Sequence, residues 1–542
     1  MDKNSTNSSP SKLFTASILA IFLYLITPAF FLGFQKTYVN WMTILGQILG
    51  FLSLLVFSWV AISNLILRRI ILTGALVLIS LLSTLELGHF LLFKHRINEA
   101  GFFSILETTP DESLEFMGSY LKATHCLMLI GFHVGIWILG FSAAKIKFPR
   151  LNSVSKKKLL LISAGFFSLN FMTWTGSDSL NSTPSIGLIR LLIENRHFHA
   201  QALQWPLKLP QITSQISRPG PETLVVLIGE STNRKHLGIY GYYRNTTPSL
   251  AKIHDAIAFD QVLSPRSHTV PALRMALTLE KHERPAQRIE NNFGILELAK
   301  AAGFQSYWLS NQAAVDWFGA RVSFLYKNAD QKFLRGSRLS AFYDEILFED
   351  LDKILTDQSF QKKFIVIHLQ GTHIAYRERY PSKFEVFKDT PQTDLKNLDH
   401  DELSIINDYD NAVGYQDFII SEIIQRLKLK EANSGLIYFS DHGQEVFDTQ
   451  KFFGHSETRA SAPMFEVPLI TWFNSAGGFY DEIQKHTLLN RNQRYSTEDL
   501  IHSFHDFLGV KTAEYDSIKS IFSRKFRSRE YQVGPQKNTP EN

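Results

Sequence analysis

The sequence predicts two unlike parts: an N-terminal bundle of five transmembrane helices and a soluble α/β/α domain with a mostly parallel sheet. Three observations support this. The chain has 542 residues, which is enough for two to four domains. Long uncharged runs lie almost entirely before residue 175, and short apolar runs alternate with helical patterns after residue 222. We therefore expect a transmembrane domain (1–174), an interfacial helix and linker (175–221), a soluble domain (222–525) and a polar tail (526–542).

The composition excludes several classes of protein. Hydrophobic residues make up 45% of the chain, and 43 Phe and 18 Tyr supply far more burial capacity than a disordered or collagenous chain has. The single cysteine, Cys126, rules out an intramolecular disulfide. A net charge of +5 is small for this length and gives no reason to expect nucleic acid as a partner.

The apolar runs predict the five membrane spans, since a bilayer core needs about 20 apolar residues per helix. They cover residues 13–35, 42–67, 70–93, 123–144 and 159–174. The length of the first run, and the spans after it, favour a retained helix over a cleaved signal peptide.

The Lys and Arg residues of the short loops predict the orientation. One set of loops holds Lys3, Lys12, Arg68, Arg69, Lys145, Lys147, Arg150, Lys156, Lys157 and Lys158, and the other only Lys36, Lys94, Arg96 and Lys122. Because positive charge stays in the cytoplasm, the N-terminus is expected there. Five crossings then place the soluble domain outside the cytoplasm.

Two segments outside the predicted spans look amphipathic. In the outer loop 94–122, Thr109, Pro110 and Asp111 resemble a helix start. This loop is either a connector lying on the membrane or a lid that contacts lipid headgroups, and the sequence favours neither. Residues 186–193 are apolar with one Arg and suit the membrane interface, and prolines up to Pro221 mark a linker.

The soluble domain contains five predicted parallel strands. They cover residues 223–228, 304–309, 364–369, 435–439 and 468–472, and helical patterns at 294–302, 341–355 and 404–428 separate them. This alternation predicts a sheet covered by helices on both faces. In such folds ligands bind beyond the carboxyl ends of the strands, so the residues after each strand are the candidates for a site.

Four of these residues have the chemistry of metal ligands. Glu230, His373, Asp441 and His442 follow three of the predicted strands and should lie at one rim of the sheet. Carboxylate oxygens and imidazole nitrogens are ligands that Zn²⁺ takes, and a catalytic site keeps one position open. Any one of them could instead be a satisfied polar group, and for His373 that alternative has equal weight.

A candidate nucleophile lies in the segment 264–278. Val270, Leu273 and Leu277 have helical spacing, and the helix is expected to start at 267–269 with Pro271 in its first turn. The hydroxyl of Thr269 would then face free backbone N–H groups that suit a phosphate. On spacing alone, a simple N-cap is the favoured interpretation of Thr269.

Four motifs resemble those of the bacterial phosphoethanolamine transferases, in the alkaline phosphatase and sulfatase superfamily. They are Val-Val-Leu-Ile-Gly-Glu-Ser-Thr-Asn-Arg at 225–234 and the motifs at 237–248, 371–381 and 438–443. The resemblance covers almost the whole chain, because that family also has five transmembrane helices before a periplasmic domain. Residues 229–234 and 264–269 look most like the branch that acts on the heptose of the lipopolysaccharide inner core, and less like the lipid A branch.

The resemblance implies roles for individual residues. The family's zinc ligands fall on Glu230, Asp441 and His442, and its nucleophile, which also touches the metal, falls on Thr269. His373 and His455 match histidines that serve the substrate phosphate or a second zinc. Thr108 and Glu112 fall where the family has its lipid-headgroup loop. Ser267 and His268 are expected to be cap or packing neighbours.

The implied function is zinc-dependent transfer of phosphoethanolamine from phosphatidylethanolamine to lipopolysaccharide, through a phosphoethanolamine–threonine intermediate. The enzyme would be a monomer in the bacterial inner membrane.

Alternatives to this function are a lipid A transferase, and a hydrolase or phosphoglycerol transferase of the same superfamily. Sulfatase activity is disfavoured, because Ser264-Pro-Arg lacks the spacing of a formylglycine motif. A binding or sensor protein would need no nucleophile. Many lipid A transferases have disulfides in the outer domain, which this chain lacks, and this departure also favours the heptose branch.

Overall fold

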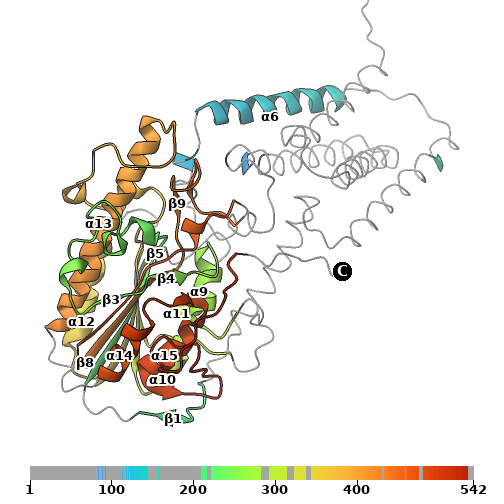
Figure 1. The fold of residues 1–542 in the computed structure, drawn as a ribbon. Coiled ribbons are helices and arrows are strands. Elements are labelled where there is room, and N and C mark those ends of the chain that lie inside the picture. The colour runs from blue at the N-terminus through green and yellow to red at the C-terminus, as the bar shows by residue number, and fades with distance from the viewer. Residues whose placement is uncertain are drawn as a thin grey trace, which may run out of the picture. The chain divides into compact units, whose positions relative to one another are not determined.

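The computed structural model describes residues 209–216, 221–281, 292–313, 323–336, 343–429, 433–457, 459–474 and 480–534, with the helix α6 (Ala123–Ala144) and isolated residues before 162 (Figure 1). The chain divides into two compact units. The first contains Met1–Phe103 and Tyr120–Arg196, and the second contains Ser104–Ser119 and His197–Asn542.

In the first unit, α6 covers the same residues as the fourth predicted span. A hydrogen bond of 2.6 Å joins its His133 Nε2 to Thr84 Oγ1, which lies in the third predicted span. The other spans, Thr108 and Glu112 lie outside the described residues, apart from isolated helical positions. Within the described part of the chain, no helix is long and apolar enough to cross a membrane. The five spans and their orientation stay predictions.

The second unit is built on a sheet that has seven strands among the described residues. Their spatial order is β3 (Ile257–Ala258), β11 (Leu469–Asn474), β8 (Asn433–Ser440), β2 (Glu222–Gly229), β7 (Lys362–His368), β5 (Gln305–Ala313) and β6 (Gln331–Gly336). All five predicted strands are present. The strands from β8 to β6 run parallel, which confirms a mostly parallel sheet.

The prediction of a parallel strand at 468–472 was wrong, because β11 is antiparallel to β8, with Leu469 opposite Phe439. The reason lies in the connection. The described residues between the two strands, 441–457 and 459–468, contain a short hairpin, β9 (Glu445–Val446) and β10 (Phe453–Gly454), rather than a crossover helix. A strand parallel to β8 would need a crossover that returns the chain to the edge of the sheet where β8 begins. Without such a crossover, β11 starts at the edge where β8 ends and runs antiparallel to it.

Helices cover both faces of the sheet, and alternate residues of β2 point to opposite faces. Val225 and Leu227 pack with α12 (Leu347–Thr356) and α13 (His400–Lys428). Leu224 and Val226 pack with α9 (Thr269–Leu277), α10 (Ile295–Ala301) and α15 (Leu500–Leu508), which lie on the other side in Figure 1. All these strand residues are fully buried, so the core consists of two apolar layers around the sheet.

The predicted helices differ from the observed ones at their starts. α13 begins at His400, four residues before the predicted start, because Asp399 caps it in a reciprocal capping box with Glu402. The helix expected from residue 341 begins as a 3₁₀ turn, η6 (Asp344–Ile346), before α12.

Smaller elements complete the unit. They are β1 (Ser214–Gln215), β13 (Val510–Lys511), β4 (Gln261–Leu263), β12 (Arg494–Ser496), η11 (Thr497–Asp499), α11 (Ser323–Tyr326) and α14 (Asp481–Asn490), with the 3₁₀ turns η2 (Arg234–His236), η3 (Gly238–Tyr240), η4 (Leu250–Lys252), η7 (Tyr376–Glu378), η8 (Ser382–Phe384) and η9 (Ala462–Met464). β12 pairs in parallel with β4, the strand that leads towards α9.

The polar tail predicted from residue 526 is corrected by the structure. Phe526 and Tyr531 are buried, and Arg529 forms ion pairs with Glu498 and Asp499. Two spaced aromatic residues are enough to pack an otherwise charged segment onto the domain. The second unit is therefore packed as far as Gly534, and the residues after it lie outside the described ranges.

Candidate active site

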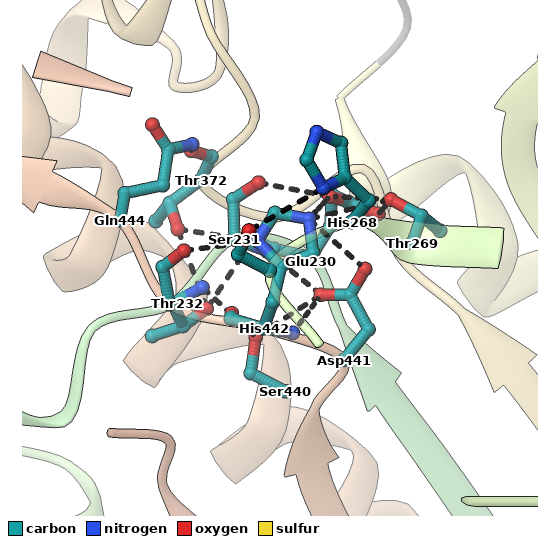
Figure 2. A network of polar contacts seen from close by, with 12 residues as sticks. Glu230, Ser231, Thr232, His268, Thr269, Thr372, Ser440, Asp441, His442 and Gln444 are labelled. Carbon is teal, nitrogen blue, oxygen red and sulfur yellow. Dashed lines mark hydrogen bonds and ion pairs between the residues drawn. The ribbon is translucent and has the colours of Figure 1, made fainter. Parts of the chain in front are cut away.

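Glu230, Asp441 and His442 meet at the carboxyl edge of the sheet (Figure 2). Glu230 directly follows β2 and Asp441 directly follows β8, and these parallel neighbours end in register at Gly229 and Ser440. One ligand atom from each of the three residues lies within 4.8 Å of the others, and all three side chains are buried. The sheet thus fixes the cluster through two neighbouring buried strands.

The hydrogen bonds of this cluster leave the right atoms available for a cation. The backbone N–H groups of Ser231 and His442 donate to Asp441 Oδ1 at 3.0 and 2.7 Å. Asp441 Oδ2 has no hydrogen-bond partner among the described residues, although it is buried. His442 Nδ1 donates to the carbonyl of Gly443 at 2.9 Å, because a carbonyl only accepts. The other ring nitrogen, His442 Nε2, lies 3.3 Å from Glu230 Oε1 and 3.4 Å from Asp441 Oδ2.

Without a cation, only protons can balance the two carboxylate charges of the cluster. Burial raises the pKa of Glu230, but the hydrogen bond and charge of His442 lower it to about 2. Burial and the charge of Glu230 raise the pKa of Asp441 to about 7. Burial opposes protonation of His442, yet the charges of Asp441 and Glu230 raise its pKa to about 9. Two buried carboxylates with one imidazole fit a divalent metal ion such as Zn²⁺, which would supply the missing positive charge.

Thr269 faces this cluster from the first turn of α9. Its Oγ1 lies 3.3 Å from both carboxylate oxygens of Glu230 and 3.4 Å from His442 Nε2. The N-cap position belongs to His268, whose side chain makes no capping bond, and Thr269 is the first helical residue. The simple N-cap interpretation of Thr269 was therefore wrong: its hydroxyl points into the cluster.

The loop before Thr269 is tied to the loop that carries Asp441. The Ser264 hydroxyl donates to the carbonyl of Asp441 at 2.5 Å, and the Ser264 N–H donates to the carbonyl of Phe465 at 2.7 Å. On the other side, Ser231 has a left-handed backbone with φ of 60°. Such strain in a non-glycine residue is typical of functional sites, and here it aims the Ser231 N–H at Asp441.

The two predicted substrate histidines lie near the cluster. The His455 ring centroid is 4.4 Å from that of His442 and 4.9 Å from that of His268. Burial and the neighbouring histidines lower the pKa of His455 well below its usual value. His373 follows a turn in which the Thr372 N–H and hydroxyl both donate to the Glu230 carbonyl at 3.0 Å, and the charge of His373 helps to lower the pKa of Glu230.

Two residues beside Glu230 were not predicted from the sequence. His368 Nε2 lies 3.9 Å from Glu230 Oε2, and burial lowers the pKa of His368 to about 4. Gln312 Nε2 lies 3.4 Å from the same oxygen and donates to the carbonyl of Leu369 at 2.7 Å. Both residues lie at the carboxyl ends of strands, β7 and β5. Gln312 follows the predicted strand 304–309, so the rule that selected Glu230 could have found it, whereas His368 falls inside the predicted strand 364–369. Thr108 and Glu112 lie outside the described residues.

Comparisons with known proteins assign the chain to a family. The chain belongs to the sulfatase family, whose model matches residues 222–510. Escherichia coli proteins named phosphoethanolamine transferase EptC are 30% identical over 323 residues, which are 58% of this chain and 55% of the relative. The match thus spans about half the length of those relatives. Salmonella typhimurium phosphoethanolamine transferase CptA is 26% identical over 83% of this chain and 82% of its own.

A more distant relative and two solved structures extend the comparison. A Salmonella typhimurium Kdo(2)-lipid A phosphoethanolamine 7''-transferase is 28% identical over 47% of this chain and 45% of its own. The periplasmic domain of Escherichia coli EptC in complex with Zn is 29% identical, with a TM-score of 0.55 over 59% of this chain and 91% of that one. The integral membrane protein EptA from Neisseria meningitidis has a similar fold, with a TM-score of 0.63 and 19% identity over 94% of this chain and 97% of that one.

Proposed function

We propose that this chain transfers phosphoethanolamine from phosphatidylethanolamine to lipopolysaccharide, with an inner-core heptose or its phosphate as acceptor. One observation carries the proposal: the Thr269 hydroxyl lies 3.3 Å from Glu230 and 3.4 Å from His442, beside a buried set of metal-ligand atoms. A binding module needs no hydroxyl in that position. The relatives named phosphoethanolamine transferase support the choice of transferred group.

Glu230, Asp441 and His442 would hold one zinc ion, and Thr269 would complete the set. The Zn complex of the Escherichia coli EptC domain supports this choice of metal. The ion, when bound, lowers the pKa of the threonine hydroxyl and offsets negative charge on the phosphoryl group. His373 and His455 would serve the substrate phosphate or, in the alternative, hold a second zinc ion.

The reaction proceeds in two displacements. Thr269 Oγ1 forms a bond to phosphorus, the bond from phosphorus to the diacylglycerol oxygen breaks, and the product is phosphoethanolamine–threonine. Burial and the neighbouring histidines lower the pKa of His455 and keep it neutral, so its ring N–H can donate a hydrogen bond to a phosphoryl oxygen. His373 acts as general acid: it gives a proton to the leaving diacylglycerol oxygen and takes up the proton that Thr269 loses, and the reverse transfer returns a proton to Thr269 when the acceptor oxygen displaces it.

The proposed location follows from the lipid substrates. We place the N-terminus in the cytoplasm and the catalytic domain in the periplasm, with five helices in the inner membrane. Thr108 and Glu112 would contact the donor headgroup from the outer loop. The resemblance of the whole chain to the fold of an integral membrane protein supports this arrangement.

A transfer assay tests the function and its acceptor. The purified full-length protein in detergent, with zinc and phosphatidylethanolamine, is given lipopolysaccharide that carries the inner core, or lipid A alone. Mass spectrometry should find one added phosphoethanolamine on the inner core. Modification of lipid A alone would instead favour the alternative that the 7''-transferase relative suggests. Ethanolamine phosphate released into water without acceptor modification would favour a hydrolase.

A further inference from the structure

The segment 526–534, here called the C-terminal strap, packs onto the domain beside the loop that carries the nucleophile. Phe526 is 4% exposed, and its ring centroid lies 5.8 Å from that of Tyr495. Tyr531 is 7% exposed, and the guanidinium of Arg529 lies 4.7 Å from its ring centroid. The strap is therefore an ordered part of the fold with its own apolar contacts.

The strap has two polar anchors. At the first, Arg529 donates to both oxygens of Asp499 at 3.0 to 3.3 Å and to Glu498 Oε1 at 3.0 Å. Asp499 is fully buried, so this is an ion pair shielded from water on the acidic side. At the second, the Gly534 N–H donates to the carbonyl of Pro265 at 2.9 Å. Gly534 has φ of 75°, a left-handed conformation that glycine adopts without strain.

Both anchors contact segments that hold Thr269 in place. Pro265 lies in the loop 264–268, which joins β4 to α9. Glu498 and Asp499 form η11, which packs against α9 and directly follows β12, the parallel partner of β4. Beyond the other end of α9, Lys281 lies 3.8 Å from Asp499 Oδ1. The strap thus connects the loop before Thr269 with the turn that supports its helix.

We infer that Arg529 and Gly534 are positioning residues for Thr269: together they fix the loop 264–268 so that the Thr269 hydroxyl stays against the metal-ligand cluster. This inference rests on the proposed function, in which Thr269 is the nucleophile. Loop 264–268 has few residues between β4 and α9, so loss of the Pro265 hydrogen bond shifts the start of the helix directly. A misplacement of about 1 Å at a reacting group can cost roughly a hundredfold in rate.

Two chains that differ by one residue test the second anchor. Protein truncated after Val533 lacks the Gly534 N–H, whereas protein truncated after Gly534 keeps it, and both have a carboxylate at the new terminus. Each is incubated with zinc and phosphatidylethanolamine micelles, and intact mass follows the phosphoethanolamine adduct with time. We expect adduct formation about tenfold slower in the chain ending at Val533, with equal zinc content and an unchanged KM for the donor.

Point variants test the first anchor. Arg529→Gln should slow adduct formation, and Arg529→Lys should recover part of the rate by restoring the charge. Glu530→Ala is the matched control, since Glu530 is exposed and pairs only at the surface with Arg494 at 2.7 Å, so its rate should equal that of the wild type. A control as slow as Arg529→Gln would overturn the inference.

Hydrogen exchange separates this inference from the proposed function. In zinc-loaded protein, the peptides covering residues 264–270 should exchange faster in the chain ending at Val533 than in the chain ending at Gly534, while β2 and β8 exchange equally. Equal exchange at 264–270, or equal adduct rates in the two chains, would overturn the role of the strap. A different outcome would be a wild type that forms no adduct while residues 264–270 still exchange faster in the chain ending at Val533. This would contradict the nucleophilic role of Thr269 but would keep the strap as a support of the loop 264–268.

Discussion

At the scale of single residues, the site depends on which atoms the hydrogen bonds leave available. Asp441 uses one carboxylate oxygen for two backbone N–H groups and keeps the other unbonded within the described residues. His442 uses Nδ1 for a carbonyl and keeps Nε2 for the cluster. Oriented donors of this kind are what a metal site needs beyond its ligands.

Removing the Thr269 hydroxyl is expected to stop the first displacement. Thr269→Ala should lower the rate of diacylglycerol release from phosphatidylethanolamine by at least about a thousandfold, since the covalent route is lost. Zinc content should change little, because Glu230, Asp441 and His442 remain. Thr269→Ser keeps a hydroxyl and should retain part of the activity. Full activity in Thr269→Ala would show that another group attacks phosphorus.

Neutralising Asp441 should have opposite effects with and without metal. Burial and the charge of Glu230 raise the pKa of Asp441 to about 7, so its charged form destabilises the metal-free fold near neutral pH. Asp441→Asn keeps Oδ1 for its two backbone donors and should raise the Tm of metal-free protein by about 2 °C, or roughly 1 kcal/mol.

The same variant should lose the rise in Tm that zinc gives the wild type, because one ligand oxygen is gone. Asp417→Asn is the control: Asp417 is buried and accepts from the N–H groups of Ser249 and Leu250, away from the cluster. Its response to zinc should match the wild type. A normal zinc response in Asp441→Asn would remove Asp441 from the ligand set.

At the scale of elements, the loops after the strands hold the site in place. The turn after β7 leaves no room for a side chain at Gly371. This residue has φ of 52°, and a Cβ there would lie 2.9 Å from the Glu230 backbone nitrogen and 3.0 Å from the Glu230 carbonyl oxygen. A side chain would therefore push the backbone that carries Glu230.

Gly371→Ala is expected to cost about 2–3 kcal/mol of unfolding free energy and to weaken zinc binding, because it combines backbone strain with a close contact. Gly241→Ala is a matched control, since Gly241 also has a positive φ, 92°, but open space around its Cβ. That variant should lose only about 1 kcal/mol and bind zinc normally. Chemical denaturation and zinc titration measure both effects, and equal losses in the two variants would contradict the close-contact explanation.

The loop after β2 is held by a buried ion network around His236. Its Nδ1 lies 2.6 Å from Asp410 and its Nε2 lies 3.2 Å from Asp448, while Arg244 and Tyr242 also bond Asp410. Burial opposes protonation of His236, but the charges of Asp448 and Asp410 raise its pKa to about 10. The charged imidazole therefore stabilises the fold.

The sign of the pH effect follows from this raised pKa. The stabilisation by the charged His236 imidazole is complete below pH 6.5, which is the pKa of this group in the unfolded chain. It is lost as the pH rises towards 10, the pKa of His236 in the folded protein. Tm measured in zinc-loaded protein from pH 6 to 10 should fall more steeply in the wild type than in His236→Gln. The variant should be less stable at pH 6 by about 3 kcal/mol, the usual cost of breaking a buried pair. Parallel Tm curves would show that His236 is neutral in the fold.

At the scale of the whole molecule, the sequence predicts most of the sheet and the meeting of Glu230, Asp441 and His442, because both follow local rules. Short apolar runs mark the strands, and the residues after β2 and β8 meet because parallel neighbours end at one edge. The direction of β11 and the packing of residues 526–534 depend on tertiary contacts that no local pattern contains. The placement of Thr269 inside α9, rather than at its cap, likewise depends on Ser264 bonding the Asp441 loop.

The covalent state of Thr269 tests the central claim most directly. Zinc-loaded wild type is incubated with phosphatidylethanolamine without acceptor, beside Thr269→Ala, and the intact mass and the modified peptide are determined. The account predicts one phosphoethanolamine on the wild type, located at Thr269, and none on the variant. No adduct on zinc-loaded wild type, or an adduct that persists in Thr269→Ala, would contradict it.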